Sequence, residues 1–113
     1  MFQITKNEHG DVIEISMRGI LDMDGARDLK FFLEEILLEK KAKFILNFRR
    51  VEKINYSNLQ MIAAPIQNLM ATGTVVLSGV SDTVAKVLKT TPYYQRLKSY
   101  ANKDEALEAL AEI

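Results

Sequence analysis

Few side chains in this sequence belong to the types that usually carry out catalysis or bind metals. The 113 residues include no cysteine, and His9 is the only histidine. A thiolate nucleophile, a disulfide framework and a cluster of histidine ligands are therefore absent. No glycine-rich phosphate loop or nucleophile elbow occurs either. These observations predict a non-catalytic protein with no metal and no cofactor.

Ser57 is the hydroxyl residue whose surroundings suggest a role. In Ser57-Asn58-Leu59-Gln60 it begins a capping box, in which the serine side chain accepts a backbone N–H and Gln60 reaches back. The same hydroxyl is also a candidate phosphoacceptor. A phosphate at a helix N-terminus would meet free N–H groups there and would repel a partner by its charge. Both roles remain open and do not exclude each other.

Charge and hydropathy exclude several classes of partner. Fifteen Lys and Arg residues balance fifteen Asp and Glu residues. The basic residues at 40–43 and 49–50 then belong to solvated faces, and no nucleic acid is expected as a partner. No apolar run approaches the roughly 20 residues that span a bilayer, so membrane insertion is not expected. The first residues lack a signal-peptide pattern, which predicts a cytoplasmic protein.

Hydrophobic periodicity predicts the elements that must position these residues. Alternating or continuous apolar residues indicate strands at 2–8, 12–18, 43–48, 74–79 and 97–100. Apolar stripes at helical spacing indicate helices at 24–40, 58–72, 82–90 and 103–113. The order β-β-α-β-α-β-α-β-α predicts an α/β fold with a mixed sheet of about five strands and packed helices. We expect one domain over residues 1–113.

Local signals predict where these helices begin and end. A short polar side chain just before a helix accepts an N–H of its first turn, and glycine often follows a helix. The residues in such positions are Asp22 or Asp24, Ser81 or Asp82, Asn102 at the start of the last helix, and Gly73 at the end of the second.

Some large side chains fall outside the predicted core. Phe31 and Leu38 lie opposite the apolar stripe of the first helix, on a charged face. They are either an association surface for a second copy or a partner, or they are covered by a neighbouring helix. Met61 points away from the stripe of the second helix, one turn after Ser57, and suits an adaptable interface.

The order of several short segments resembles the STAS domain family. Gly19-Ile20-Leu21-Asp22 is similar to the family's Gly-Glu-Leu-Asp before the first helix. Residues 44–48, followed by Val51 and Ile54, are similar to its central strand and the approach to its switch loop. Gly79-Val80 and Glu105-Ala106-Leu107 fit its later elements. The resemblance covers nearly the whole chain and implies a STAS-like fold.

The family's signature, Asp-Ser-Ser-Gly-Leu, here reads Asn55-Tyr56-Ser57-Asn58-Leu59. In anti-sigma factor antagonists of the family, the first serine is phosphorylated by the partner kinase. Tyr56 holds that position, and Ser57 matches the second serine. The resemblance therefore implies a degenerate phosphorylation switch, with Ser57 as the remaining phosphoacceptor candidate and Tyr56 as an aromatic anchor for a partner.

The resemblance implies a protein-interaction module similar to an anti-sigma factor antagonist. Such a module binds an anti-sigma factor, a histidine-kinase-like Ser/Thr kinase, and so releases a sigma factor. The alternatives are a STAS subunit of a larger signalling or lipid-transport ATPase complex, and a small-ligand or nucleotide-binding domain. The residues expected at the partner surface are Asp22, Asn55, Tyr56, Ser57, Asn58 and Met61.

Overall fold

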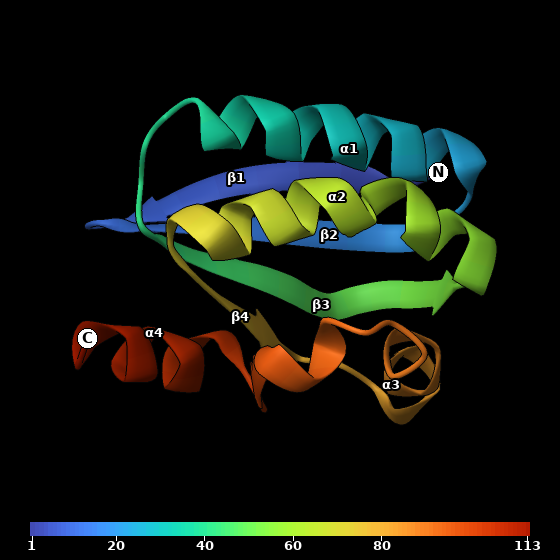
Figure 1. Cartoon of the computed structure of the whole chain (residues 1–113). Coiled ribbons are helices and arrows are strands. Elements are labelled where there is room, and N and C mark those ends of the chain that lie inside the picture. Colours follow the sequence, from blue (N-terminus) through green and yellow to red (C-terminus); the bar gives the residue numbers. More distant parts are fainter.

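The chain forms a mixed five-stranded sheet with helices on both faces (Figure 1). The computed structural model describes all residues, 1–113. In chain order the elements are β1 (Gln3–His9), β2 (Val12–Leu21), α1 (Met23–Leu37), β3 (Lys43–Ile54), α2 (Tyr56–Thr72), β4 (Thr74–Ser78), α3 (Asp82–Leu88), the 3-10 helix η1 (Tyr94–Arg96), β5 (Lys98–Tyr100) and α4 (Lys103–Ala111). This order confirms the predicted α/β architecture, with η1 as the one added turn.

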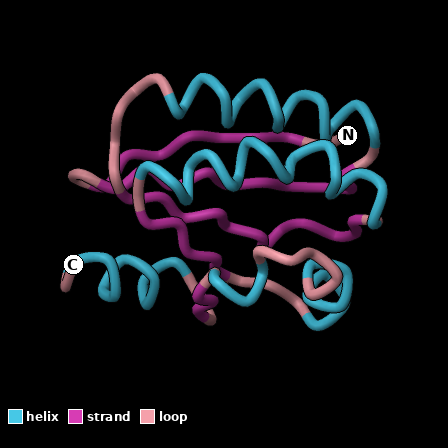
Figure 2. Tube along the Cα trace, in the orientation of Figure 1, coloured by secondary structure: helices cyan, strands magenta, loops and turns pink.

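The strands lie side by side in the order in which they occur in the sequence (Figure 2). β1 and β2 are antiparallel and form a hairpin. Gly10 has φ +64° in its turn, a conformation that glycine adopts without a steric penalty. The other neighbouring pairs are parallel. Parallel strands need crossover helices, and this explains why α1, α2 and α3 alternate with β3, β4 and β5.

The core has two parts, one on each face of the sheet. Alternate residues of the central strands point toward α1, α2 and α3 and form the main core, as Ile15 and Leu46 do. On the other face, Ile45 and Val76 pack against Ala106 and Leu110 of α4. Figure 1 shows α1 and α2 on one side of the sheet and α4 on the other. The first part of β3, residues 44–46, is therefore covered on both faces, as its continuous apolar run predicts.

The two central strands are longer than the sequence predicts. β2 continues to Leu21 and β3 to Ile54, so that residues 49–54 are in strand conformation beyond the predicted strand end at residue 48. The register between β2 and β3 shifts twice in this region, between Ser16 and Arg18 and between Gly19 and Ile20. Each shift is a β-bulge, which inserts an extra residue into one strand. Because of the bulges, the buried residues in the second half of β3, Phe48, Val51 and Ile54, lie three positions apart. The alternation of buried and exposed residues that usually indicates a strand is therefore absent from this part of the sequence.

Several helix boundaries follow the local signals. Asp22, Ser81 and Asn102 are the N-caps of α1, α3 and α4, and each side chain accepts a backbone N–H three residues later. Gly73 ends α2, where a Cβ atom would collide with the carbonyl oxygen of Ala42. No helix has both the length and the hydropathy that a bilayer-crossing segment requires.

Candidate functional site

Two helix N-termini begin side by side at one edge of the sheet. Leu21 and Ile54 are paired residues at the carboxyl ends of the parallel strands β2 and β3. The next residues, Asp22 and Asn55, are the N-caps of α1 and α2. The Asp22 carboxylate accepts the N–H of Gly25 at 2.7 Å. The expected site residues on these two loops therefore do come together in the fold.

Asn55, and not Ser57, caps α2. The backbone of Asn55 is extended, and its side-chain oxygen accepts the N–H of Asn58 at 3.0 Å. Ser57 lies inside the first turn, and its hydroxyl donates to the same oxygen of Asn55 at 3.0 Å. The predicted capping box at Ser57 and Gln60 is therefore wrong. The physical reason is that asparagine is at least as good a cap as serine, and here it directly follows the strand.

Asn58 holds the two loops together from inside. Its side chain is only 5% exposed, and its amide nitrogen donates to the carbonyl oxygen of Leu21 at 2.6 Å. A residue this buried has no side-chain atoms to offer a partner. The sequence places Asn58 on the partner surface, whereas the structure gives it the role of fixing the end of β2 against the first turn of α2.

Large apolar or aromatic side chains are exposed beside these caps, among polar ones. Met23 and Tyr56 are the first residues of α1 and α2, and 60% and 52% of their surface is exposed. Ile20 is 49% exposed, but it alternates with the core residue Leu21 and so lies on the sheet face opposite α1 and α2. Met23 and Tyr56, together with the exposed caps and Ser57, form what we call the cap surface: Asp22, Met23, Asn55, Tyr56 and Ser57.

Met23 is a member of this surface that sequence reasoning missed. One signal was present, because Met23 follows the cap Asp22 as Tyr56 follows the cap Asn55. Met61, by contrast, is half-buried and packs against the main core. It borders the cap surface without being a free side chain, because part of its surface is already used inside the protein.

The first turn of α2 differs electrostatically from the corresponding turns of α1, α3 and α4. Those three helices carry acidic residues in the first turn, and α2 carries none. The positive end of its helix dipole is therefore not offset by a side-chain charge. Ser57 is exposed at this end. A phosphate on its hydroxyl would be electrostatically favoured by the helix itself.

A buried carboxylate lies on the opposite face of the sheet from α1 and α2. Glu14 is 4% exposed, and its two oxygens accept from Asn47 and from the ring of His9, each at 2.8 Å. Burial alone would raise the pKa of Glu14. The hydrogen bonds from Asn47 and His9 and the nearby charge of Lys103 outweigh burial and leave the pKa below its ordinary value. His9 is thus engaged in a structural contact.

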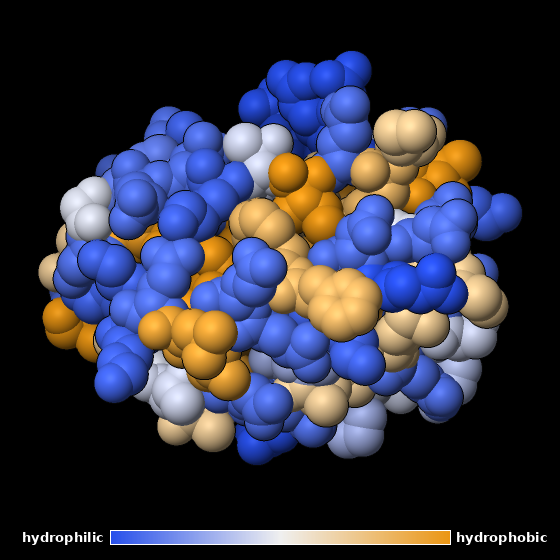
Figure 3. All heavy atoms as spheres, turned by 90° about the horizontal axis from the view of Figure 1, so that it is seen from above, coloured by the Kyte–Doolittle hydropathy of each residue, from blue (hydrophilic) through white to orange (hydrophobic).

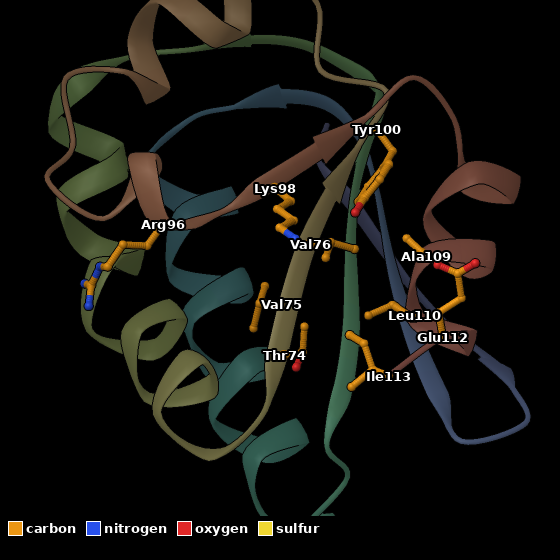
Figure 4. Close-up of a pocket in the computed structure, with 10 residues that line it drawn as sticks. All are labelled: Thr74, Val75, Val76, Arg96, Lys98, Tyr100, Ala109, Leu110, Glu112 and Ile113. Carbon is orange, nitrogen blue, oxygen red and sulfur yellow. The ribbon is translucent and has the colours of Figure 1, made fainter.

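The largest hollow of the molecule lies away from the cap surface. It has a volume of about 390 Å³ and is formed by β4, the region of β5 and the end of α4. In Figure 4, Leu110 and Ile113 project from the α4 region toward the strands. None of the expected site residues lines it. No group of three or more histidine, aspartate or glutamate side chains is arranged to hold a metal ion.

Phe31 and Leu38 remain uncovered on α1. They are 57% and 77% exposed, so no neighbouring helix covers them. Phe32, the next residue, packs against the main core instead. Figure 3 looks down on this side of the molecule and shows apolar atoms interrupting an otherwise polar surface. Of the two interpretations of Phe31 and Leu38, coverage by a neighbouring element is wrong.

Comparison with solved structures finds the same fold in several proteins. An anti-sigma factor antagonist from Mycobacterium paratuberculosis superposes with a TM-score of 0.84 at 20% identity, covering 98% of this chain and 95% of that one. The Bacillus cell fate determinant SpoIIAA in its phosphorylated form gives 0.74 at 20% identity, covering 97% and 99%. A sulfate transporter family protein from Wolinella succinogenes gives 0.77 at 24% identity, covering 96% and 93%.

At these identities the structural matches establish the fold alone. No protein with curated function matches the sequence. The sequence itself matches the STAS domain over residues 3–106, nearly its full length. That match agrees with the strand order, with the caps after β2 and β3, and with the segments that carry the sequence resemblance. The chain therefore belongs to the STAS domain family.

Proposed function

We propose that this chain, as a single STAS domain over residues 1–113, is a non-catalytic protein-interaction module of the anti-sigma factor antagonist type. Its partner is an anti-sigma factor of the histidine-kinase-like Ser/Thr kinase class. Binding occupies that factor and so releases a sigma factor. The membership of the family and the fold shared with anti-sigma factor antagonists support this proposal.

The observation that carries the proposal is the cap surface. Met23 and Tyr56 expose large side chains at equivalent positions, the first residues of α1 and α2. Their backbones are held by two side-chain caps, and the Asn58–Leu21 hydrogen bond links the two loops. Apolar and aromatic side chains on a rigid base, with polar residues around them, are the typical centre of a protein–protein contact.

We also infer that phosphorylation of this module is weaker than in family members that keep the acceptor serine. Tyr56 holds the family's acceptor position and does not present a serine hydroxyl there. Ser57 is exposed, but its hydroxyl donates to Asn55. A phosphate on Ser57 would lose that donor and would place negative charge beside the Asn55 oxygen. Ser57 must therefore turn outward before a kinase can modify it, and we expect transfer to be slow.

Binding to the anti-sigma factor kinase encoded nearest this protein tests the surface. Met23→Ala and Tyr56→Ala should each weaken the affinity by about 1–2 kcal/mol, measured by calorimetry. Ile113→Ala is the control, because it removes an exposed apolar side chain that belongs neither to the cap surface nor to the outer face of α1. Unchanged affinity in both cap-surface variants, or an equal loss in the control, contradicts the assignment.

The exposed pair Phe31 and Leu38 favours a second candidate function. A STAS subunit inside a larger assembly, such as a signalling complex or a lipid-transport ATPase complex, needs a second contact face besides the cap surface. A purified complex distinguishes the two functions. If the bound protein is a transporter ATPase and its contact depends on Phe31 and Leu38, the assembly function is correct; if it is a histidine-kinase-like protein, the antagonist function is correct.

A further inference from the structure

The sheet face opposite α1 and α2 is only partly covered. α4 packs over Ile45 and Val76, on one side of this face. Over β1, β2 and the middle of β3 the face is open and contains two hollows of about 190 and 330 Å³. The two hollows share Ser16 and Arg50, so they form one continuous depression, which we call the polar trough. No apolar residue lines either part.

A β-bulge concentrates positive charge in the polar trough. Ser16 pairs with Asn47, but Arg18 pairs with Arg50, so β3 contains one more residue than β2 in this interval. Phe48 and Val51 both point into the main core. The two residues between them, Arg49 and Arg50, therefore both lie on the open face, where a regular strand would place only one of them.

The bulge is held by specific contacts. The side-chain oxygen of Asn47 accepts the backbone N–H of Arg49 at 3.0 Å, while its amide nitrogen donates to Glu14. Gly79 lies against the bulge, because a Cβ atom there would come within 2.8 Å of the Arg49 Cβ. Arg49 and Arg50 are therefore placed by packing and hydrogen bonding on both sides of the bulge.

The cations of the trough form no ion pairs within the protein. Arg18, Arg49, Arg50 and Lys103 line the trough, and none of them forms an ion pair. The single carboxylate there is Glu14, and Asn47 and His9 already occupy its two oxygens. Three guanidinium groups and one ammonium group thus face a concave polar surface with an unbalanced positive charge.

We propose that the polar trough binds a small phosphorylated, polyhydroxylated molecule. Guanidinium groups bind phosphate oxygens with two parallel hydrogen bonds. The hydroxyl and amide side chains of Thr5, Asn7 and Ser16 can exchange hydrogen bonds with the hydroxyls of such a ligand. The lack of apolar or aromatic lining disfavours an acyl chain or a nucleobase, which would need a stacking or apolar surface. This site is separate from the cap surface.

Calorimetry at low salt, with fructose 1,6-bisphosphate and pyrophosphate as probes, tests the proposal. We expect saturable binding of both, tighter binding of the sugar bisphosphate, and none of unphosphorylated fructose. Arg18→Gln and Arg50→Gln should each weaken binding by about tenfold, the loss of one charge-assisted contact. Arg27→Gln is the matched control, because Arg27 lies on α1, on the other side of the sheet. It should change binding by less than twofold.

Several results would overturn the proposal. They are the absence of saturable binding by either phosphorylated probe, equal losses in Arg27→Gln and Arg50→Gln, and tighter binding of a single-stranded oligonucleotide than of the sugar bisphosphate. Thermal unfolding of each variant shows whether a loss of binding reflects a loss of folding. Binding of the anti-sigma factor kinase should be unchanged in Arg50→Gln, so the failure of this site and of the cap surface are distinguishable.

Discussion

Asn55 has two hydrogen-bonding roles at the start of α2. Its side-chain oxygen accepts both the N–H of Asn58 and the hydroxyl of Ser57. The neighbouring residue Tyr56 is left exposed by this arrangement, and Asn58 is turned inward to Leu21. At the scale of single residues, the signature segment therefore combines two kinds of residue. Asn55 and Asn58 hold the structure by hydrogen bonds, and Tyr56 and Ser57 between them are exposed to a partner.

Removing the cap should be more harmful than removing the hydroxyl of Ser57. We expect Asn55→Ala to lower the free energy of unfolding by about 1 kcal/mol, because the Asn58 N–H loses its acceptor. Ser57→Ala should cost less, since its hydroxyl is exposed and water can replace the lost bond. Urea denaturation measures both, with Asn55→Asp as the control that keeps the cap. A larger loss of unfolding free energy in Ser57→Ala than in Asn55→Ala would indicate that Ser57, and not Asn55, is the cap.

The same residues determine how the protein responds to a kinase. Wild-type protein should take up little phosphate from the kinase encoded nearest it, and what it takes up should be on Ser57. Asn55→Asp combined with Tyr56→Ser restores the family's motif and should be phosphorylated at residue 56. Mass spectrometry after incubation locates the phosphate. Stoichiometric phosphate on the wild-type chain would refute the weakened switch.

Glu14 should make stability depend on acid pH. Because its pKa is lowered in the folded protein, the carboxylate stabilises the fold above pH 4.5, its ordinary pKa, and this stabilisation is lost as the pH falls through the lowered pKa. Glu14→Gln should flatten the acid limb of a plot of urea midpoint against pH. Glu8→Gln, an exposed carboxyl on β1, is the control and should leave that limb unchanged. An acid limb that is as steep in Glu14→Gln as in the wild type would contradict this role.

At the scale of elements, β3 organises both surfaces. Its first bulge places Arg49 and Arg50 on the open face, and its last residue, Ile54, delivers Asn55 to the start of α2. The strand thus contributes to the polar trough in its middle and to the cap surface at its end. A bulge changes the sheet face on which the residues of a strand lie. β3 can therefore contribute residues to two different sites, which a regular strand would not do.

The outer face of α1 gives a separate prediction at this scale. Phe31→Glu combined with Leu38→Lys should reduce self-association or binding of a partner, because it replaces two exposed apolar groups with charges. Analytical ultracentrifugation measures the first effect and calorimetry the second. Ile113→Lys, another exposed apolar residue, is the control. If neither sedimentation nor partner binding changes, the pair is not an association surface.

At the scale of the whole molecule, the topology brings distant segments together at one edge. The strand order follows the sequence, so β2 and β3 are neighbours and their carboxyl ends coincide. Residues 22–23 and 55–57 then form one surface although more than thirty positions of sequence separate them. With α1, α2 and α3 sharing the main core, α4 is the one helix that packs on the opposite face, and part of that face is left open.

Much of this architecture was predictable from the sequence by itself. The element order, the mixed sheet, the cap at Asn102 and the family follow from signals that are local along the chain. The same signals narrow the caps of α1 and α3 to two candidates each. Apolar periodicity reports which side of an element is buried, and a cap acts within three residues. The sequence left open whether Phe31 is exposed or covered by a neighbouring helix. A helical wheel shows the direction in which a side chain points, but it does not show what lies opposite that side chain.

Other features were decided by the tertiary structure. Strand pairing with β2 turned residues 49–54 into strand, and the bulges that result depend on contacts between segments far apart in sequence. The inward turn of Asn58 depends on the carbonyl of Leu21. The addition of Met23 to the cap surface depends on two neighbouring strand ends, and the polar trough depends on where α4 packs. Each of these requires knowledge of which non-local groups meet, and a pattern read along one chain does not contain that information.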